Sequence, residues 1–203
     1  GQEPRLLARA HGVAQAFIKE RRSQDARLLM QMLAIASRNG DAELWHALRS
    51  TLDSDLRPLD RMAVISALGS FGDKDLFEKS LQLITDSVVK PAELALMGRG
   101  MSRQTRGVAW QWMILNYGFL SKSLSTRDRG RLPWFGSGFC HEDDLDRVAS
   151  FFEMTTHSPP GLSSNLDRVL ETIQRCIGER SRLRKPMAGW IKARSGLKPR
   201  SRD

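Results

Sequence analysis

Apolar residues recur at three- and four-residue steps along most of the chain, which predicts amphipathic helices. The clearest pattern occurs twice, around Gly40-Asp41 and, 32 residues later, around Gly72-Asp73. In each copy one apolar-periodic run precedes the glycine and another follows the aspartate. Glycine can close a helix in the left-handed conformation, and aspartate accepts hydrogen bonds from the free N–H groups that open the next helix. Each copy is therefore predicted to form a helix, a tight turn and a second helix.

The two copies also align residue by residue, with the following apolar pairs at the same offset: Leu33 and Ile65, Leu44 and Leu76, Trp45 and Phe77, Leu52 and Ile84. A unit of this size cannot bury its apolar stripe alone, so such units stack on one another, as they do in helical-repeat proteins. The alternative is two unrelated helical hairpins in an ordinary bundle, because two copies are fewer than the roughly three that repeats usually need.

The same periodicity predicts the other helices. They are expected over residues 4–19, 25–38, 41–52, 61–71, 73–85, 91–97, 142–155 and 187–194, with another that Ser164 or Asn165 caps. Pro58 suits a first helical turn, and 127–138 is expected to be a loop or a short helix. An aromatic stripe from Gln104 to Leu120, and Trp190 with Ile191 in the last helix, are expected in the core. No alternating run predicts a strand.

The predicted fold class is therefore all-α: an α-solenoid of antiparallel helix pairs without a sheet. We expect one α-helical repeat domain over residues 1–194, which is within the size that a single core supports. Residues 195–203 are expected to form a basic, disordered tail.

The net charge of +9 comes mainly from the C-terminal end of the chain. From Arg180 onward there are nine basic residues and one acidic residue, whereas residues 1–179 carry 23 basic and 22 acidic ones. A basic tail of this kind can bind polyanions weakly and in a salt-sensitive manner. Because the rest of the chain is nearly neutral, we interpret it as a solvated chain end and expect no specific nucleic-acid partner.

Cys140 and Cys176 are too few for a disulfide framework, and their spacing matches no metal-ligand pattern. We expect reduced, half-buried thiols in a cytoplasmic protein. No run of about 18 apolar residues predicts a membrane span, so no membrane partner is expected. The start at Gly1 does not resemble a signal peptide, and a targeting region upstream of it is left open.

A search for catalytic chemistry finds one tempting motif, His141-Glu142-Asp143-Asp144-Leu145, which begins like the zinc motif H-E-x-x-H. That motif needs two imidazoles one helical turn apart, and leucine stands at the second position here. The acidic residues are typical of a helix start, where the helix dipole favours them. The chain also has neither a phosphate-binding P-loop nor a G-x-S-x-G elbow, so we predict no catalytic residue, no metal ligand and no cofactor in this chain.

Several segments in the second half nevertheless carry a family pattern. They are the tryptophan-rich run 108–113 leading to Asn116-Tyr117, Phe139-Cys140 before the acidic helix that ends in Phe151-Phe152, the segment 169–173, and Gly189-Trp190-Ile191. In this order they resemble the C-terminal, HEAT-like helical domain of zinc aminopeptidases, the family of aminopeptidase N and the endoplasmic-reticulum aminopeptidases. The two Gly-Asp turns resemble those of bacterial members. The resemblance covers about residues 6–191 and implies a HEAT/armadillo-like solenoid.

The resemblance implies a non-catalytic domain that caps the catalytic cleft, shapes peptide access and takes part in interdomain closure. The catalytic zinc and the H-E-x-x-H and G-x-M-E-N motifs of the family belong to a domain that is absent here, so the parent protein is expected to be the metalloprotease. The expected partners are that catalytic domain and a peptide substrate. Since guanidinium groups bind carboxylates, Arg99, Arg103 and Arg106 are candidates for the peptide cavity. The alternative function is a stand-alone helical-repeat scaffold that binds a protein.

Overall fold

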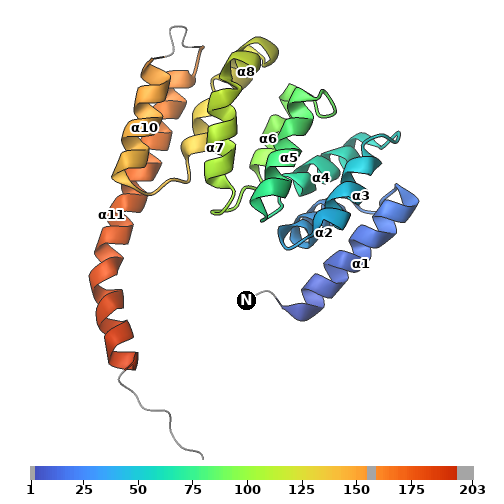
Figure 1. The fold of residues 1–203 in the computed structure, drawn as a ribbon, viewed down its shortest axis with the longest axis horizontal. Coiled ribbons are helices and arrows are strands. Elements are labelled where there is room, and N and C mark those ends of the chain that lie inside the picture. The colour runs from blue at the N-terminus through green and yellow to red at the C-terminus, as the bar shows by residue number, and fades with distance from the viewer. Residues whose placement is uncertain (1–2, 155–158, 196–203) are drawn as a thin grey trace, which may run out of the picture.

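The computed structural model describes residues 3–154 and 159–195, and for residues 183–195 the course of the backbone alone. Every regular element in this part of the chain is helical, which confirms the all-α prediction (Figure 1). The first half comprises α1 (Pro4–Glu20), α2 (Ala26–Arg38), α3 (Ala42–Thr51), α4 (Pro58–Leu68) and α5 (Lys74–Thr85). These bounds lie within a few residues of those that the apolar periodicity predicts.

The second half contains shorter elements followed by one long helix. The short 3₁₀ turn η1 (Pro91–Glu93) leads into α6 (Leu94–Gly98), and α7 (Arg106–Leu115), α8 (Tyr117–Ser123) and α9 (Thr126–Arg129) follow. A second 3₁₀ segment, η2 (Leu132–Gly136), precedes α10 (Glu142–Glu153) and α11 (Leu162–Ser195). The region 127–138, predicted as a loop or short helix, therefore holds the end of α9 and all of η2.

Helix starts agree with the predicted capping chemistry. Asp41 accepts a hydrogen bond from the backbone N–H of Leu44 at 2.9 Å, and Asp73 accepts from the N–H groups of Asp75 and Leu76 at 3.0 Å. Pro58 is the first residue of α4, where its missing N–H leaves no bond unmade. Each of these caps satisfies backbone donors that would otherwise have no partner in the helix.

The two predicted turns lie against each other, and their glycines do not have the predicted conformation. Gly40 and Gly72 do not adopt the left-handed conformation, which among the described glycines occurs at Gly161. A Cβ atom on Gly72 would lie 2.6 Å from the backbone oxygen of Arg38, and one on Gly40 would lie 2.9 Å from the ring of Phe71. Glycine is needed at these positions because the turn after α2 packs directly on the turn after α4.

The helices follow one another along a curved row, from α1 at one end to α10 and α11 at the other (Figure 1). Helices α2, α4 and α6 are packed in succession, as are α5, α7 and η2. Two hydrogen bonds join segments that are separated by similar lengths of chain. Trp45 Nε1 donates to Ser80 Oγ at 2.8 Å, 35 residues later, and Arg61 Nε donates to Glu93 Oε1 at 3.0 Å, 32 residues later. Stacked helix pairs produce separations of this size, and the HEAT/armadillo-like classification stays a prediction.

The aromatic stripe of α7 forms the core of the second half, as predicted. Trp110 is 1% exposed and makes edge-to-face contacts with Phe139, Phe151 and Phe152, with ring centroids 5.7 to 6.1 Å apart. The stripe is narrower than the sequence indicates, because Leu115 is 74% exposed where α7 ends. Leu115 thus faces away from the core, and core packing continues on either side of it with Met113 in α7 and with Tyr117 and Leu120 in α8.

The C-terminal helix corrects two predictions. Ser164 and Asn165 lie inside the first turn of α11 and not at its N-cap, because the helix begins at Leu162. The separate helix predicted over 187–194 is part of α11, which continues through Pro186. Proline lacks one backbone donor, and the remaining bonds on both sides keep the helix continuous. The predicted burial of Trp190 and Ile191 lies outside the side chains that the structure describes.

Candidate functional site

A cavity of about 320 Å³ lies where η1 and α6 face the segment from Leu124 to Ser137. Its walls are mainly apolar, and two arginines, Arg99 and Arg131, with Asp128, supply the charges. The apolar lining residues include Pro91, Leu94, Met101, Leu132, Trp134 and Phe135. An apolar cavity with a few charged groups at its rim is the usual form of a small-ligand or peptide-residue site.

Trp134 is the large exposed side chain of this cavity, with 41% of its surface accessible. Its indole N–H donates to Asn165 Oδ1 at 3.1 Å, and the amide nitrogen of Asn165 donates to the backbone oxygen of Gly130 at 2.8 Å. The first turn of α11 thus holds both the ring of Trp134 and the end of α9 in place. The indole is therefore positioned before any ligand arrives.

The three arginines predicted for a peptide cavity lie in different surroundings. Arg99 lines the cavity and is exposed. Arg103 is also exposed but does not line the cavity, and Arg106 is half-buried at the start of α7. Of the three, Arg99 has the position that a cavity cation needs. The role of all three in peptide binding stays a prediction.

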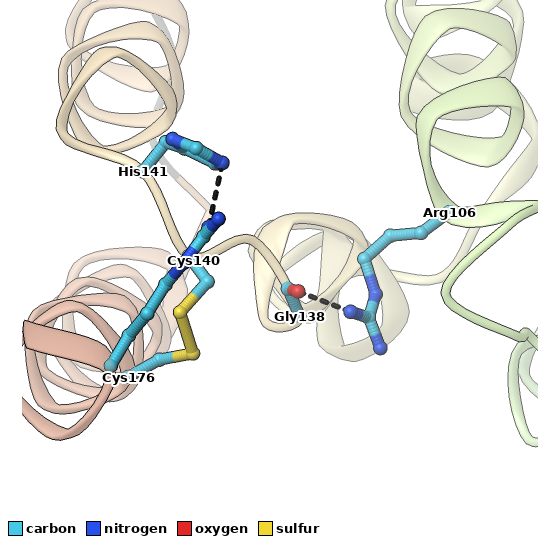
Figure 2. Close-up of a disulfide and its surroundings, with 6 residues drawn as sticks. Arg106, Gly138, Cys140, His141 and Cys176 are labelled. Carbon is cyan, nitrogen blue, oxygen red and sulfur yellow. Dashed lines mark hydrogen bonds between the residues drawn. A yellow bond between two sulfur atoms is a disulfide. The ribbon is translucent and has the colours of Figure 1, made fainter. Parts of the chain in front are cut away.

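Arg106 has a structural contact that its position in the sequence did not reveal. Its guanidinium donates to the backbone oxygen of Gly138, and a Cβ atom on Gly138 would overlap the guanidinium carbon at 1.7 Å (Figure 2). Burial lowers the pKa of Arg106 from its usual value, and the charge of Arg103 lowers it further. An arginine nevertheless remains charged at neutral pH, so this contact is a charge-assisted hydrogen bond between α7 and the segment after η2.

The two cysteines correct the expectation of free thiols. Cys140 and Cys176 form a disulfide with their Cα atoms 5.3 Å apart (Figure 2). The sequence did not reveal this pair because the two residues are 36 positions apart and meet only when α11 packs antiparallel to α10. One helical turn further along α11, Arg180 lies 2.8 Å from His141 Nε2. Residues 138–141, which we call the joint segment, are therefore attached to both α7 and α11.

The residues of this chain do not fit the zinc ion that the resemblance assigns to the parent enzyme. In the H-E-x-x-H-like motif, Leu145 replaces the second imidazole, and the Nε2 atom of His141 faces the guanidinium of Arg180. Within the described residues, no group of three or more His, Cys, Asp or Glu side chains could hold a metal ion. The motif has one imidazole where the zinc motif needs two, and its acidic residues form the first turn of α10.

Sequence reasoning missed Arg131, Trp134 and Phe135 as cavity residues. The only local signal was an arginine and two aromatic residues close to Pro133 in a stretch without helical periodicity. Such a stretch indicates an irregular segment, but the partner wall, η1 with α6, is more than 30 residues earlier in the chain. The cavity therefore becomes visible only when η2 is placed beside α6.

Fold and cavity together define an all-α domain of packed helix pairs with a mainly apolar cavity that Arg99 and Arg131 help to line. The sequence model of one protein family, described as ERAP1-like C-terminal domain, matches residues 1–175, and the chain belongs to this family. Over 119 residues the chain is 29% identical to Aminopeptidase 2, mitochondrial, of Saccharomyces cerevisiae. That match covers 56% of this chain and 12% of the yeast protein, so the chain spans a small fraction of this relative's length.

In the described residues, no helix combines the length and the apolar character that crossing a membrane requires. The long helix α11 contains several arginines in its described part, which accounts for this result.

Proposed function

We propose that this chain is the non-catalytic C-terminal domain of a zinc-dependent aminopeptidase, in which it caps the catalytic cleft and shapes peptide access and interdomain closure. The observation that carries the proposal is membership of the ERAP1-like C-terminal domain family over residues 1–175. The name of the yeast relative, an aminopeptidase, supports the same activity for the parent protein. The proposed partners are the catalytic domain of that parent and its peptide substrate.

The cavity is suited to binding a part of the peptide that lies away from the bond that is cleaved. Its apolar walls suit an apolar side chain, and the guanidinium of Arg99 suits a carboxylate, which it can bind through two parallel hydrogen bonds. A peptide that reaches this cavity from the catalytic site must span the distance between the two domains. The domain therefore distinguishes long peptides from short ones.

The first test uses the chain by itself. The purified chain is expected to release no amino acid from a chromogenic N-terminal amide. Release that disappears on addition of a chelator would place catalysis in this chain and overturn the proposal. The reading frame upstream of Gly1 gives a second test, because an in-frame domain with H-E-x-x-H supports the proposal. A start codon there instead favours the stand-alone scaffold that binds a protein partner.

A third test uses the full-length parent protein with Arg99→Ala. Loss of a partly exposed charged contact costs about 1 kcal/mol, so KM for peptides long enough to reach the cavity is expected to rise about fivefold. Turnover of a single-residue chromogenic amide should not change. The matched control is Arg9→Ala, since Arg9 is exposed on α1, which forms one end of the row, and does not line the cavity. Equal effects of Arg99→Ala on long and short substrates would contradict a role in peptide length selection.

A further inference from the structure

The Cys140–Cys176 disulfide lies at the end of the α10–α11 hairpin where α10 begins. Helix α10 ends and α11 begins at the opposite end of the hairpin, so the disulfide closes a covalent ring through the whole hairpin. Both cysteines are half-buried. A small dithiol can therefore approach the sulfur atoms without unfolding the chain.

Beyond this disulfide, α11 leaves the rest of the molecule. Arg180, which lies against His141, joins α11 to the segment before α10. The helix then continues for 15 residues to Ser195, a length of about 22 Å at 1.5 Å per residue. In Figure 1 this part of α11 projects past the end of α10 with no described helix beside it. The disulfide and the Arg180–His141 contact thus set the direction of the projecting part.

The surroundings of the sulfur atoms favour exchange. Arg175 is adjacent to Cys176 in the sequence, and Arg180 is one turn further along α11 and reaches His141, the neighbour of Cys140. Guanidinium groups stabilise the thiolate that leaves when a disulfide is attacked. The carboxylates of the first turn of α10 oppose this effect, but one of them, Asp144, is already paired with Arg147 at 2.5 Å. Arg175 and Arg180 therefore favour the leaving thiolate, and the carboxylates of Glu142, Asp143 and Glu179 act against it.

Packing of the hairpin does not depend on the sulfur atoms. Val148 and Phe152 of α10, and Val169 and Ile173 of α11, are at most 2% exposed and form the apolar contact between the helices. This contact lies between the disulfide and the end of the hairpin where α10 ends and α11 begins. Without the disulfide, the base of the hairpin stays packed. The joint segment then loses its covalent link to α11 and keeps the packing of Phe139 on Trp110 together with the Arg106–Gly138 and Arg180–His141 contacts.

We propose that Cys140–Cys176 is a thiol–disulfide exchange site that controls the direction of the projecting part of α11, independently of the proposed peptidase role. A thiolate of a dithiol reductant attacks one sulfur, forms a mixed disulfide and releases the other cysteine as a thiolate, which takes up a proton. The second thiol of the reductant then attacks the mixed disulfide and releases the first cysteine as a thiolate, which takes up a proton. The two sulfur atoms of the reductant are now joined in a disulfide. The chain gains two electrons and two protons and carries two free thiols.

The test compares the oxidised full chain with the same chain under dithiothreitol and in a glutathione buffer, both without denaturant. Alkylation followed by mass measurement counts free thiols, circular dichroism checks helix content, and hydrogen exchange follows residues 138–141 and 176–182. We expect both cysteines to be reduced in both conditions with helix content retained. Exchange after Cys176 should rise at least about tenfold, while exchange in α2 to α5 changes less than about twofold.

The double variant Cys140→Ser/Cys176→Ser serves as the matched control, and its exchange should equal that of the reduced chain with or without reductant. Three results would overturn the proposal. The disulfide could resist both reductants until the chain unfolds, which is the behaviour of a disulfide that serves stability alone. The reduced chain could exchange like the oxidised one, or the thiols could remain unpaired after oxidation.

Discussion

Replacement of Gly72 by alanine tests the direct contact between the two glycine turns. The added Cβ would lie 2.6 Å from the backbone oxygen of Arg38, whereas an ordinary contact is 3.4 Å or longer. One turn must therefore move by about 0.8 Å, and the atom in the way is backbone, which cannot rotate aside. Overpacking of this kind costs about 1 to 3 kcal/mol.

Part of this cost is offset. Gly72 is not in the left-handed conformation, so alanine is allowed there and reduces the entropy of the unfolded chain, a gain of about 0.4 to 1 kcal/mol. The net loss of unfolding free energy should be about 1 to 2 kcal/mol. For a chain of this size, that corresponds to a fall of roughly 2 to 8 °C in Tm.

Gly12→Ala provides the matched control. Gly12 is exposed in α1, and a Cβ atom there would meet nothing within 4 Å. Alanine in a helix interior should raise stability by about 0.5 to 1 kcal/mol. Gly40→Ala should fall between the two variants, because its close contacts at 2.8 and 2.9 Å are the side chains of Leu44 and Phe71, which can shift. Urea and thermal unfolding followed by circular dichroism measure all three. A stabilised Gly72→Ala protein would refute the contact between the turns.

Three further changes have expected outcomes. Trp110→Ala removes a side chain that is 1% exposed and should lower the unfolding free energy by about 3 to 5 kcal/mol in urea titrations. Cys176→Ser, measured without reductant, opens a ring closed across 36 residues and should cost at most about 4 kcal/mol on the loop-entropy model. At Asp60, burial raises the pKa. Hydrogen bonds from Arg57 and Ser23, together with the charge of Arg57, lower the pKa by more than burial raises it, so it lies below its usual value. The stability that Asp60 contributes is present above the unfolded pKa of about 3.9 and is lost as the pH falls through the lower folded value. Unfolding midpoints of Asp60→Asn should therefore fall less steeply than those of the unchanged chain below about pH 4, and parallel curves would contradict this assignment.

Local signals in the sequence were sufficient for most of the helices. Asp41 and Asp73 cap the helices that they were predicted to cap, and Pro58 begins α4. These predictions succeeded because a cap depends on residues within three or four positions of each other. The prediction of a separate last helix was wrong, because α11 continues through Pro186 although proline favours a helix boundary there.

The candidate site was accessible to sequence reasoning only in part. Arg99 was selected from its position before the tryptophan-rich helix, and it does line the cavity. Arg106 was selected on the same grounds, but its guanidinium is bound to the oxygen of Gly138, 32 residues later. A residue type predicts which contacts are chemically possible, and it does not say which partner the fold brings within reach.

The sequence by itself determined that the described part of the chain is helical and that Asp41 and Asp73 begin helices, because apolar periodicity and capping act over a few residues. Only the tertiary structure decided that these turns pack on each other, that Cys140 meets Cys176, and that η2 and α6 enclose a cavity. Each of these contacts joins segments about 30 residues apart, and their geometry depends on how whole helices pack.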